Sequence, residues 1–246
     1  MHRLADVSAD VIRRYDHHRI PVVRKTDDSP VTAADREAET AMRDVIMDRH
    51  PDHGILGEEF GTHQEDATLR WVLDPIDGTK SFISGTPLFG TLIALCADGE
   101  PLLGCINMPR LQQRFVGDGH STTRNGAPVR MRTGRGIRDA TVLVTDHVDV
   151  WKHRNGQAFD RLAAAAGIFR SWGDCYGYTL LVSGYADIMT DPLLNPWDMH
   201  ALIPIVRGAG GMITSWEGDD PLSSNSLVAA HPALHARVIA MLNPPR

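Results

Sequence analysis

Residues 71–80 read Trp71-Val72-Leu73-Asp74-Pro75-Ile76-Asp77-Gly78-Thr79-Lys80, and the fold prediction starts from this stretch. The apolar run before Asp74 predicts a short buried strand. Pro75 restricts the residue before it to extended backbone, so Asp74 is expected at the end of that strand. Asp77-Gly78-Thr79 then predicts a sharp turn into a new element, where free backbone N–H groups favour an anion.

Two carboxylates beside an anion-binding turn have a chemical consequence. Asp74 and Asp77 would repel a phosphate unless cations lie between the charges, and Mg²⁺ is an ion that prefers such oxygen ligands. An ordinary Asp-Pro turn followed by a helix N-cap would use the same residue types. This stretch alone leaves both interpretations open.

Further blocks of sequence favour the metal-binding interpretation over the ordinary turn. They are Gly57-Glu58-Glu59 upstream, and Pro196-Trp197-Asp198 followed by Gly208-Ala209-Gly210-Gly211 downstream. Together with Asp74-Pro75-Ile76-Asp77-Gly78-Thr79 they resemble the inositol monophosphatase superfamily of Mg²⁺-dependent, lithium-sensitive phosphatases. The resemblance spans roughly residues 25–216 and implies a layered αβαβα sandwich with the site between its halves.

The resemblance also implies the metal ligands of the site. About two to three Mg²⁺ ions are expected, and Li⁺ and Ca²⁺ are expected to inhibit. The implied ligands are Glu58, Asp74, the Ile76 carbonyl, Asp77 and Asp198, with Asp74 bridging two ions.

Catalytic and phosphate-binding groups follow from the same resemblance. The nucleophile is expected to be water. Thr79 would orient that water and would itself be hydrogen-bonded to Asp35. Glu58 is expected to act in catalysis through the metal. The backbone N–H groups of Gly78 and Thr79 would bind the phosphate. An acid in the first turn of a helix, complementing the helix dipole, is the alternative interpretation of Asp35.

Substrate specificity is predicted from two other acids. Gly173-Asp174-Cys175-Tyr176-Gly177-Tyr178 resembles histidinol-phosphate phosphatases, and Asp191 stands where inositol phosphatases have a substrate-binding acid. Histidinol phosphate carries a cationic amine and an imidazole with a pKa near ~6.5, both of which suit carboxylate partners. The alternatives are that Asp174 caps a helix and that Asp191-Pro192 is a turn.

The predicted reaction is therefore Mg²⁺-dependent hydrolysis of L-histidinol phosphate to L-histidinol and phosphate. Other substrates remain open: inositol 1-phosphate, another sugar phosphate, or 3′-phosphoadenosine 5′-phosphate, whose phosphatases share the Lys80 that follows Thr79. A non-catalytic metal-binding regulator is a further alternative. Retention of Glu58, Asp74, Asp77, Thr79 and Asp198 together argues against it.

Composition limits the possible partners and location. With 25 basic and 31 acidic residues the net charge is −6, which argues against a nucleic-acid or anionic-membrane surface. No apolar run is long enough to span a bilayer, and residues 1–6 do not resemble a signal peptide. Three cysteines without Cys-x-x-Cys spacing fit a reducing cytoplasm. A homodimer is implied by the resemblance only.

The pattern of elements predicts an α/β fold with α+β-like mixed sheets, as one compact unit with halves 1–135 and 136–246. Helices are expected at 5–19, 32–49, 155–166 and 175–183, from Trp197, and at the end of the chain with Pro232 in the first turn. Strands are expected at 53–56, 90–96, 102–108, 114–116, 140–145, 168–172, 186–190, 212–216 and 226–230. Thr32 is a candidate N-cap, and Pro204 is expected to kink or delay its helix. The basic segment 123–138 is expected to be a solvated connection.

Overall fold

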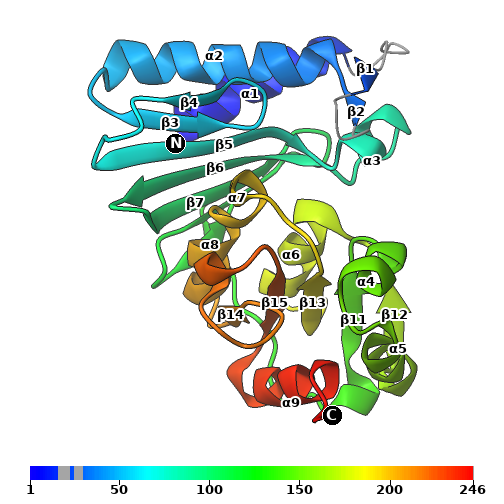
Figure 1. The fold of residues 1–246 in the computed structure, drawn as a ribbon. Coiled ribbons are helices and arrows are strands. Elements are labelled where there is room, and N and C mark those ends of the chain that lie inside the picture. Colours follow the sequence, from blue (N-terminus) through cyan, green and yellow to red (C-terminus); the bar gives the residue numbers. More distant parts are fainter. Residues whose placement is uncertain (16–22, 25–29, 246) are drawn as a thin grey trace.

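The computed structural model describes residues 1–15, 23–24 and 30–245. The end of the first helix, predicted near residue 19, lies outside the described residues, and so does most of segment 25–30, which the sequence predicts to be a polar loop. Within the described residues the chain forms an eight-stranded and a five-stranded sheet with helices on both sides and between them (Figure 1), and a small two-stranded sheet of Val23–Arg24 and Pro30–Val31. No helix in the described part of the chain has the length and apolarity needed to cross a membrane.

The elements have the following bounds. The helices are α1 (His2–Tyr15), α2 (Ala33–Arg49), α3 (Thr79–Ile83), α4 (His147–His153), α5 (Gly156–Ala165), α6 (Asp174–Val182), α7 (Pro196–Met199), α8 (Leu202–Gly208) and α9 (Pro232–Leu242). The strands are β1 (Val23–Arg24), β2 (Pro30–Val31), β3 (Gly54–Gly57), β4 (Gly61–His63), β5 (Leu69–Asp77), β6 (Gly90–Ala97), β7 (Glu100–Met108), β8 (Gln113–Gly117), β9 (Thr122–Arg124), β10 (Ala127–Pro128), β11 (Thr141–Val144), β12 (Ile168–Arg170), β13 (Ile188–Asp191), β14 (Met212–Thr214) and β15 (Leu227–Ala230).

The first sheet contains the predicted central strand. Its order is β10-β9-β8-β7-β6-β5-β3-β4, and β5 to β10 form an antiparallel meander. β3 pairs with β5 in parallel, with Gly57 opposite Leu73. Because parallel strands end at the same edge of a sheet, the residues after Gly57 and Leu73 emerge side by side.

The second sheet is mixed and has the order β12-β11-β13-β15-β14. β11 runs parallel to β12 and β13, while β15 is antiparallel to β13 and β14. Val144 lies opposite Thr190, so Thr145 and Asp191 follow at the same edge. This is a second place where strand ends bring polar residues together.

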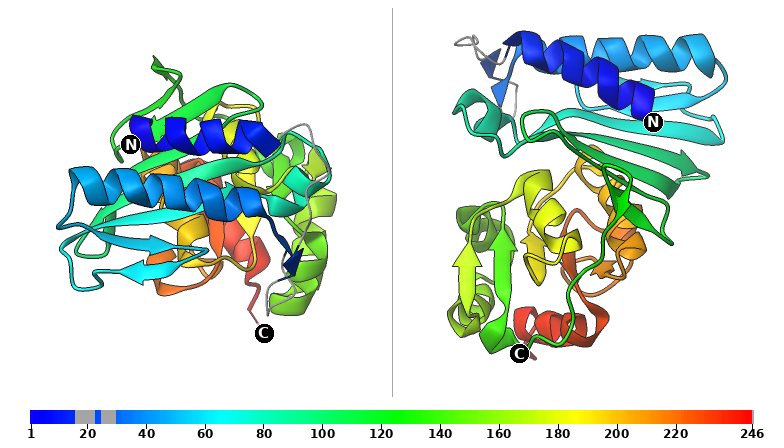
Figure 2. Two further views of the ribbon diagram at one scale, coloured as in Figure 1. Left: turned by 90° about the horizontal axis from the view of Figure 1, so that it is seen from above. Right: turned by 180° about the vertical axis from the view of Figure 1, so that it is seen from behind.

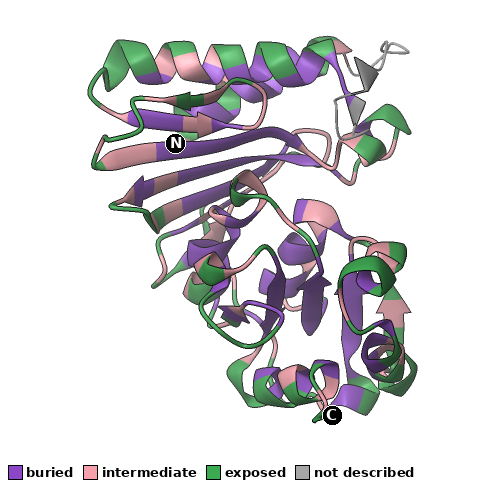
Figure 3. Cartoon of the chain, viewed as in Figure 1, coloured by how far each residue is buried: buried purple, intermediate pink, exposed green. Residues whose placement is uncertain are grey.

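Five layers result from the packing of helices on these sheets. α1 and α2 lie side by side on the outer face of the first sheet (Figure 2), where Met42, Ile46 and Leu73 share one buried cluster. α6 and α8 pack between the sheets, and α5 and α9 cover the outer face of the second sheet. Buried residues accordingly follow the strands, and exposed ones follow the outer helix faces (Figure 3). The predicted αβαβα sandwich with mixed sheets is confirmed.

Local predictions are confirmed where the signals are strong. Thr32 caps α2, accepting from the Ala34 N–H at 3.1 Å, and its own N–H donates to Asp35 at 2.8 Å. Pro204 lies in the first turn of α8, so the helix expected from Trp197 is divided into α7 and α8.

Two local predictions are corrected. The short helix α4 was not expected, because its seven residues give too little periodicity to recognise. The segment 123–138 is only partly a solvated connection: it contributes to β9 and β10, and it buries Met131 and Ile137. Arg132 in this segment donates to Asp187 through Nε at 2.6 Å, so that guanidinium serves an internal ion pair.

Candidate metal and phosphate site

Three of the predicted metal ligands converge at the edge where β5 meets α7. Asp74, Asp77 and Asp198 each offer a carboxylate oxygen, and these oxygens all lie within 4.8 Å of one another. In a regular strand, residues three apart would point to opposite faces. The pairing of β5 with β6 is irregular between Asp74 and Asp77, and this irregularity allows both acids to reach one site.

Asp198 reaches the same site from the first turn of α7. The Asn195 N–H donates to Asp198 Oδ2 at 2.7 Å, so the carboxylate closes a capping box at the start of that helix. Pro196 occupies the first helical position, which favours helix initiation there. A local cap therefore orients an acid that lies more than a hundred residues from Asp74 in the sequence.

The electrostatics of these carboxylates call for a cation. Asp74 is 2% exposed, and its Oδ1 has no hydrogen-bond partner among the described residues. Burial, followed by the charges of Glu58, Asp77 and Asp198, raises the pKa of Asp74 well above its usual value. Burial likewise raises the pKa of Asp198 to about 7. Clustered carboxylate oxygens, one of them buried and unpartnered, fit a hard divalent cation such as Mg²⁺.

Glu58 and Ile76 line the cavity beside these acids. The cavity has a volume of about 370 Å³ and is also lined by Asp74, Asp77, Gly78, Thr79 and Asp198. Glu58 follows β3, and its N–H donates to the Leu73 carbonyl at 3.2 Å, which sets it beside Asp74. Its charge contributes to the raised pKa of Asp74, which is consistent with this proximity. All five predicted ligands thus border one cavity.

The predicted turn at Gly78 is present. Gly78 has φ of 89° and precedes the five-residue helix α3. A side chain at this position would be strained, and its Cβ would lie 3.0 Å from both Asp174 Oδ2 and the Leu88 carbonyl oxygen. The structure therefore brings the backbone of Gly78 and Thr79 to the wall of the same cavity.

The expected hydrogen bond between Thr79 and Asp35 is not formed in the structure. The Thr79 hydroxyl donates to the Ile76 carbonyl at 3.0 Å, and a hydroxyl has only one proton to donate. Asp35 instead accepts from the Thr32 N–H and from its hydroxyl, the latter at 2.6 Å. These contacts fit the alternative interpretation, in which Asp35 is an acid in the first turn of a helix. Burial, opposed by those Thr32 bonds and reinforced by the charge of Glu58, raises the pKa of Asp35.

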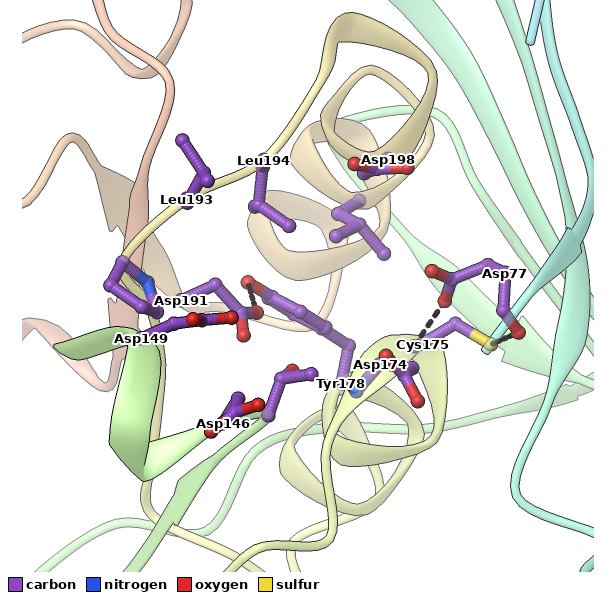
Figure 4. Close-up of a pocket in the computed structure, with 13 residues that line it drawn as sticks. Asp77, Asp146, Asp149, Asp174, Cys175, Tyr178, Asp191, Leu193, Leu194 and Asp198 are labelled. Atoms are coloured by element: carbon purple, nitrogen blue, oxygen red, sulfur yellow. Dashed lines mark hydrogen bonds between the residues drawn. The ribbon is translucent and has the colours of Figure 1, made fainter. Parts of the chain in front are cut away.

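The two predicted substrate acids line an adjoining cavity of about 150 Å³ (Figure 4). Asp191 ends β13; its Oδ2 accepts from the Tyr178 hydroxyl at 2.7 Å, and its Oδ1 has no hydrogen-bond partner in the described residues. Burial raises the pKa of Asp191 to about 6. Burial and the charge of Asp191 raise the pKa of Asp174 to about 7, while Lys80 opposes that shift.

The capping alternative for Asp174 does not apply. Gly173 is the N-cap of α6 and Asp174 is the first helical residue, with φ of 48°. Its N–H donates to Thr145 Oγ1 at 2.8 Å. The carboxylate is thus left to face the cavity and the Gly78 turn.

Sequence reasoning missed two further acids of the site. Asp146 and Asp149, at the start of the unexpected helix α4, line both cavities together with Asp77, Asp174 and Asp198. Asp146 Oδ1 accepts from the Val148 N–H at 2.8 Å as the N-cap, and Asp149 pairs at 2.8 Å with the exposed Lys152. The signal was present, because an acid directly after the predicted strand 140–145 lies at the edge where parallel strands end.

Comparisons with known proteins agree with this geometry. A family model described as the inositol monophosphatase family matches residues 2–244. A bifunctional phosphatase from Arabidopsis thaliana, IMPL2, is 43% identical over 92% of the chain; the chain spans 66% of that protein. A histidinol-phosphatase from Chlorobaculum parvum is 39% identical over 93% of the chain and 89% of its own length.

A solved structure of an inositol monophosphatase from Zymomonas mobilis is also 39% identical. It superimposes with a TM-score of 0.87 over 98% of this chain and 95% of its own. Since the family model and these relatives cover nearly the whole chain, the protein is a phosphoric monoester hydrolase that belongs to the inositol monophosphatase family.

Proposed function

We propose that the protein hydrolyses L-histidinol phosphate to L-histidinol and phosphate in a Mg²⁺-dependent reaction. The observation that carries this proposal is the charge of the cavities beside the metal acids. Asp146, Asp149, Asp174 and Asp191 line them, and among the described lining residues Lys80 is the one lysine or arginine. A substrate whose organic part is cationic suits such walls.

The residues proposed to hold the Mg²⁺ ions are Glu58, Asp74, the Ile76 carbonyl, Asp77 and Asp198. Bound Mg²⁺ would supply positive charge to the phosphoryl oxygens and make water a stronger nucleophile. The protein otherwise contributes positioning, which accounts for most of the catalysis of phosphoryl transfer. Ca²⁺ is expected to inhibit because it prefers longer bonds and more ligands, and Li⁺ inhibition is carried over from the family.

Thr79 and the Gly78 turn are proposed to hold the reacting groups. Their backbone N–H groups bind the phosphoryl oxygens, and the Thr79 hydroxyl oxygen, which donates its proton to Ile76, accepts a hydrogen bond from the attacking water. The water oxygen bonds to phosphorus while the bond from phosphorus to the histidinol oxygen breaks, and one proton of the water ends on that histidinol oxygen. Asp35 is proposed to act in catalysis through Thr79.

Recognition of the organic part is assigned to the acids. Asp174 and Asp191 would accept hydrogen bonds from the amine and the imidazole, and Asp191 Oδ1 has the free acceptor capacity for one of them. Asp146 and Asp149 add negative charge around the same space. A nucleotide bisphosphate would meet repulsion there, and a neutral polyol would leave the buried carboxylates without ionic partners.

Inositol 1-phosphate is the second candidate substrate. The support for it is the 39% identity to the Zymomonas mobilis inositol monophosphatase, which equals the identity to the Chlorobaculum parvum histidinol-phosphatase. Sequence identity therefore favours neither substrate, and the choice of histidinol phosphate depends on the acid-lined cavity.

Steady-state phosphate release tests the proposal. We expect kcat/KM for histidinol phosphate to exceed that for inositol 1-phosphate and for 3′-phosphoadenosine 5′-phosphate by about 10²-fold or more, the effect of one desolvated ionic contact. Asp149→Asn should raise KM for histidinol phosphate alone. Asp219→Asn, an exposed acid outside both cavities, is the matched control. A preference of wild type for either competing substrate would overturn the assignment.

The assembly proposed for the enzyme is a cytoplasmic homodimer in which residues 1–135 and 136–246 form one compact unit. Support for the single unit comes from the cluster between the sheets, where Val72 and Leu92 pack with Leu143 and Met189. All three cysteines are buried and unpaired, which fits a reducing compartment. Light scattering coupled to gel filtration measures the oligomeric state directly.

A further inference from the structure

A row of charged residues on α2 faces the loop that carries Glu58. Asp35, Glu39 and Arg43 are spaced by four residues and therefore lie along one side of the helix. Glu39 is completely buried, which is unusual for a carboxylate. Figure 1 shows α2 running alongside β3 and β4. In the sequence, Glu58 lies in the loop between these two strands.

Among the described residues, the Glu39 carboxylate accepts hydrogen bonds from that loop and from Arg43. Its Oε2 accepts from the Glu59 N–H at 2.7 Å, and its Oε1 accepts from the Phe60 N–H at 3.2 Å. Arg43 Nε donates to Oε1 at 2.7 Å, and its guanidinium also donates to the Gly61 carbonyl. The buried charge is thus paired, and it satisfies two backbone N–H groups of the turn.

Gly57 permits this close approach. A Cβ at Gly57 would lie 1.9 Å from Glu39 Oε1 and 2.8 Å from a terminal Arg43 nitrogen, so a side chain there would displace the Glu39 carboxylate. Glycine at this position is explained by the helix packing against the loop rather than by its dihedral angles, because its φ is not positive.

Glu58 is consequently held from both sides. Its own N–H donates to Leu73 of β5, and the next N–H along the chain donates to Glu39 of α2. Strand β5 and helix α2 therefore both fix the backbone position of Glu58, from which its side chain extends. Glu58 itself lines the cavity that contains Asp74, Asp77 and Asp198.

We propose that Glu39, paired with Arg43, is a positioning residue that sets the Glu58 carboxylate for Mg²⁺ binding. This inference rests on the metal site of the proposed function, and it is independent of which phosphate monoester is hydrolysed. Glu39 lies behind the loop and does not touch the substrate cavity. Its effect is therefore on the affinity for metal and not on recognition of the organic part.

Calorimetric titration of Mg²⁺ into the metal-free protein, without substrate, tests the proposal. We expect Glu39→Gln to weaken Mg²⁺ binding by about 10- to 100-fold, the range found for groups that orient metal ligands. Arg43→Lys, which keeps the charge and loses the forked contact to Glu39 and Gly61, should weaken it in the same direction with less risk to folding. Glu37→Gln is the matched control, since Glu37 is an exposed acid on the same helix that pairs with Arg14.

Several outcomes distinguish the positioning role of Glu39 from a contribution to folding alone. A purely structural role would lower the melting temperature of the metal-free variant and leave its Kd for Mg²⁺ within about twofold of wild type, and that result overturns the proposal. An equal loss in Glu37→Gln overturns it as well. If wild type binds no Mg²⁺, both this inference and the metal site are wrong, whereas rejection of histidinol phosphate as substrate leaves the titration result unaffected.

Discussion

Replacing Asp74 by asparagine should have opposite effects on stability and on activity. Asp74 is buried and lies within 4.8 Å of the oxygens of Asp77 and Asp198. Two unit charges at 4.8 Å repel by about 3.5 kcal/mol at an effective dielectric constant of about 20. The neutral amide removes this repulsion, and its N–H groups have carboxylate acceptors around them.

The net gain is smaller than the pairwise repulsion, because the metal-free cluster already relieves part of it by taking up protons, as the raised pKa of Asp74 indicates. We expect Asp74→Asn to raise the free energy of unfolding of the metal-free protein by about 1–3 kcal/mol, or roughly 3–9 °C in melting temperature for a chain of this size. Activity should fall about 10³-fold or more, since metal ions contribute several kcal/mol to transition-state stabilisation.

Two assays on the same preparations check this prediction. Thermal unfolding is followed at pH 8 after removal of metal by a chelator, and kcat/KM is measured at saturating Mg²⁺. Asp48→Asn, an exposed acid on α2, should change neither quantity. Wild-type activity in Asp74→Asn, or a lower melting temperature of its metal-free form, would refute the reasoning that Asp74 is a metal ligand repelled by the neighbouring carboxylates.

Two further predictions concern the substrate acids and Thr79. In the folded protein the pKa of Asp174 is about 7 and that of Asp191 is about 6, both above the usual 3.8. The two acids therefore bind protons more tightly in the folded state, and the stability that this contributes is fully present below about pH 4 and is lost as the pH rises through 6 to 7. The melting temperature of the metal-free protein should therefore fall more steeply between about pH 5 and about pH 8 than that of the double variant Asp174→Asn/Asp191→Asn; parallel profiles would contradict this. Thr79→Val should lower kcat by about 10²-fold while Thr79→Ser keeps most of it, and equal rates for the two variants at saturating Mg²⁺ would remove the hydroxyl from the mechanism.

Much of the fold was predictable because its signals are local. The alternation of apolar residues in the meander, the N-cap at Thr32, the first-turn proline Pro232 and the proline after Asp74 each act on the few residues around them. The metal acids could be named for a related reason. Asp74 and Asp77 share one short stretch with a turn glycine, and the resemblance of two distant blocks added Glu58 and Asp198.

The remaining features depended on contacts that a linear pattern does not contain. The short helix α4 has too few residues for a recognisable period, so Asp146 and Asp149 went unnoticed until parallel pairing of β11 and β13 brought them beside Asp191. The resemblance predicts a hydrogen bond between the Thr79 hydroxyl and Asp35, whereas in the structure the Ile76 carbonyl accepts the single hydroxyl proton.

Glu39 illustrates the division most clearly. By itself the sequence determined that α2 is a helix and that Asp35, Glu39 and Arg43 share one side of it, because the helical period is a property of neighbouring residues. That this side packs against the turn after Gly57 follows from the fold, because the burial of Glu39, its pairing and the two N–H bonds it accepts arise when segments about twenty residues apart are in contact. Short sequence patterns thus identify candidate acids, and packing between distant elements decides which of them act together.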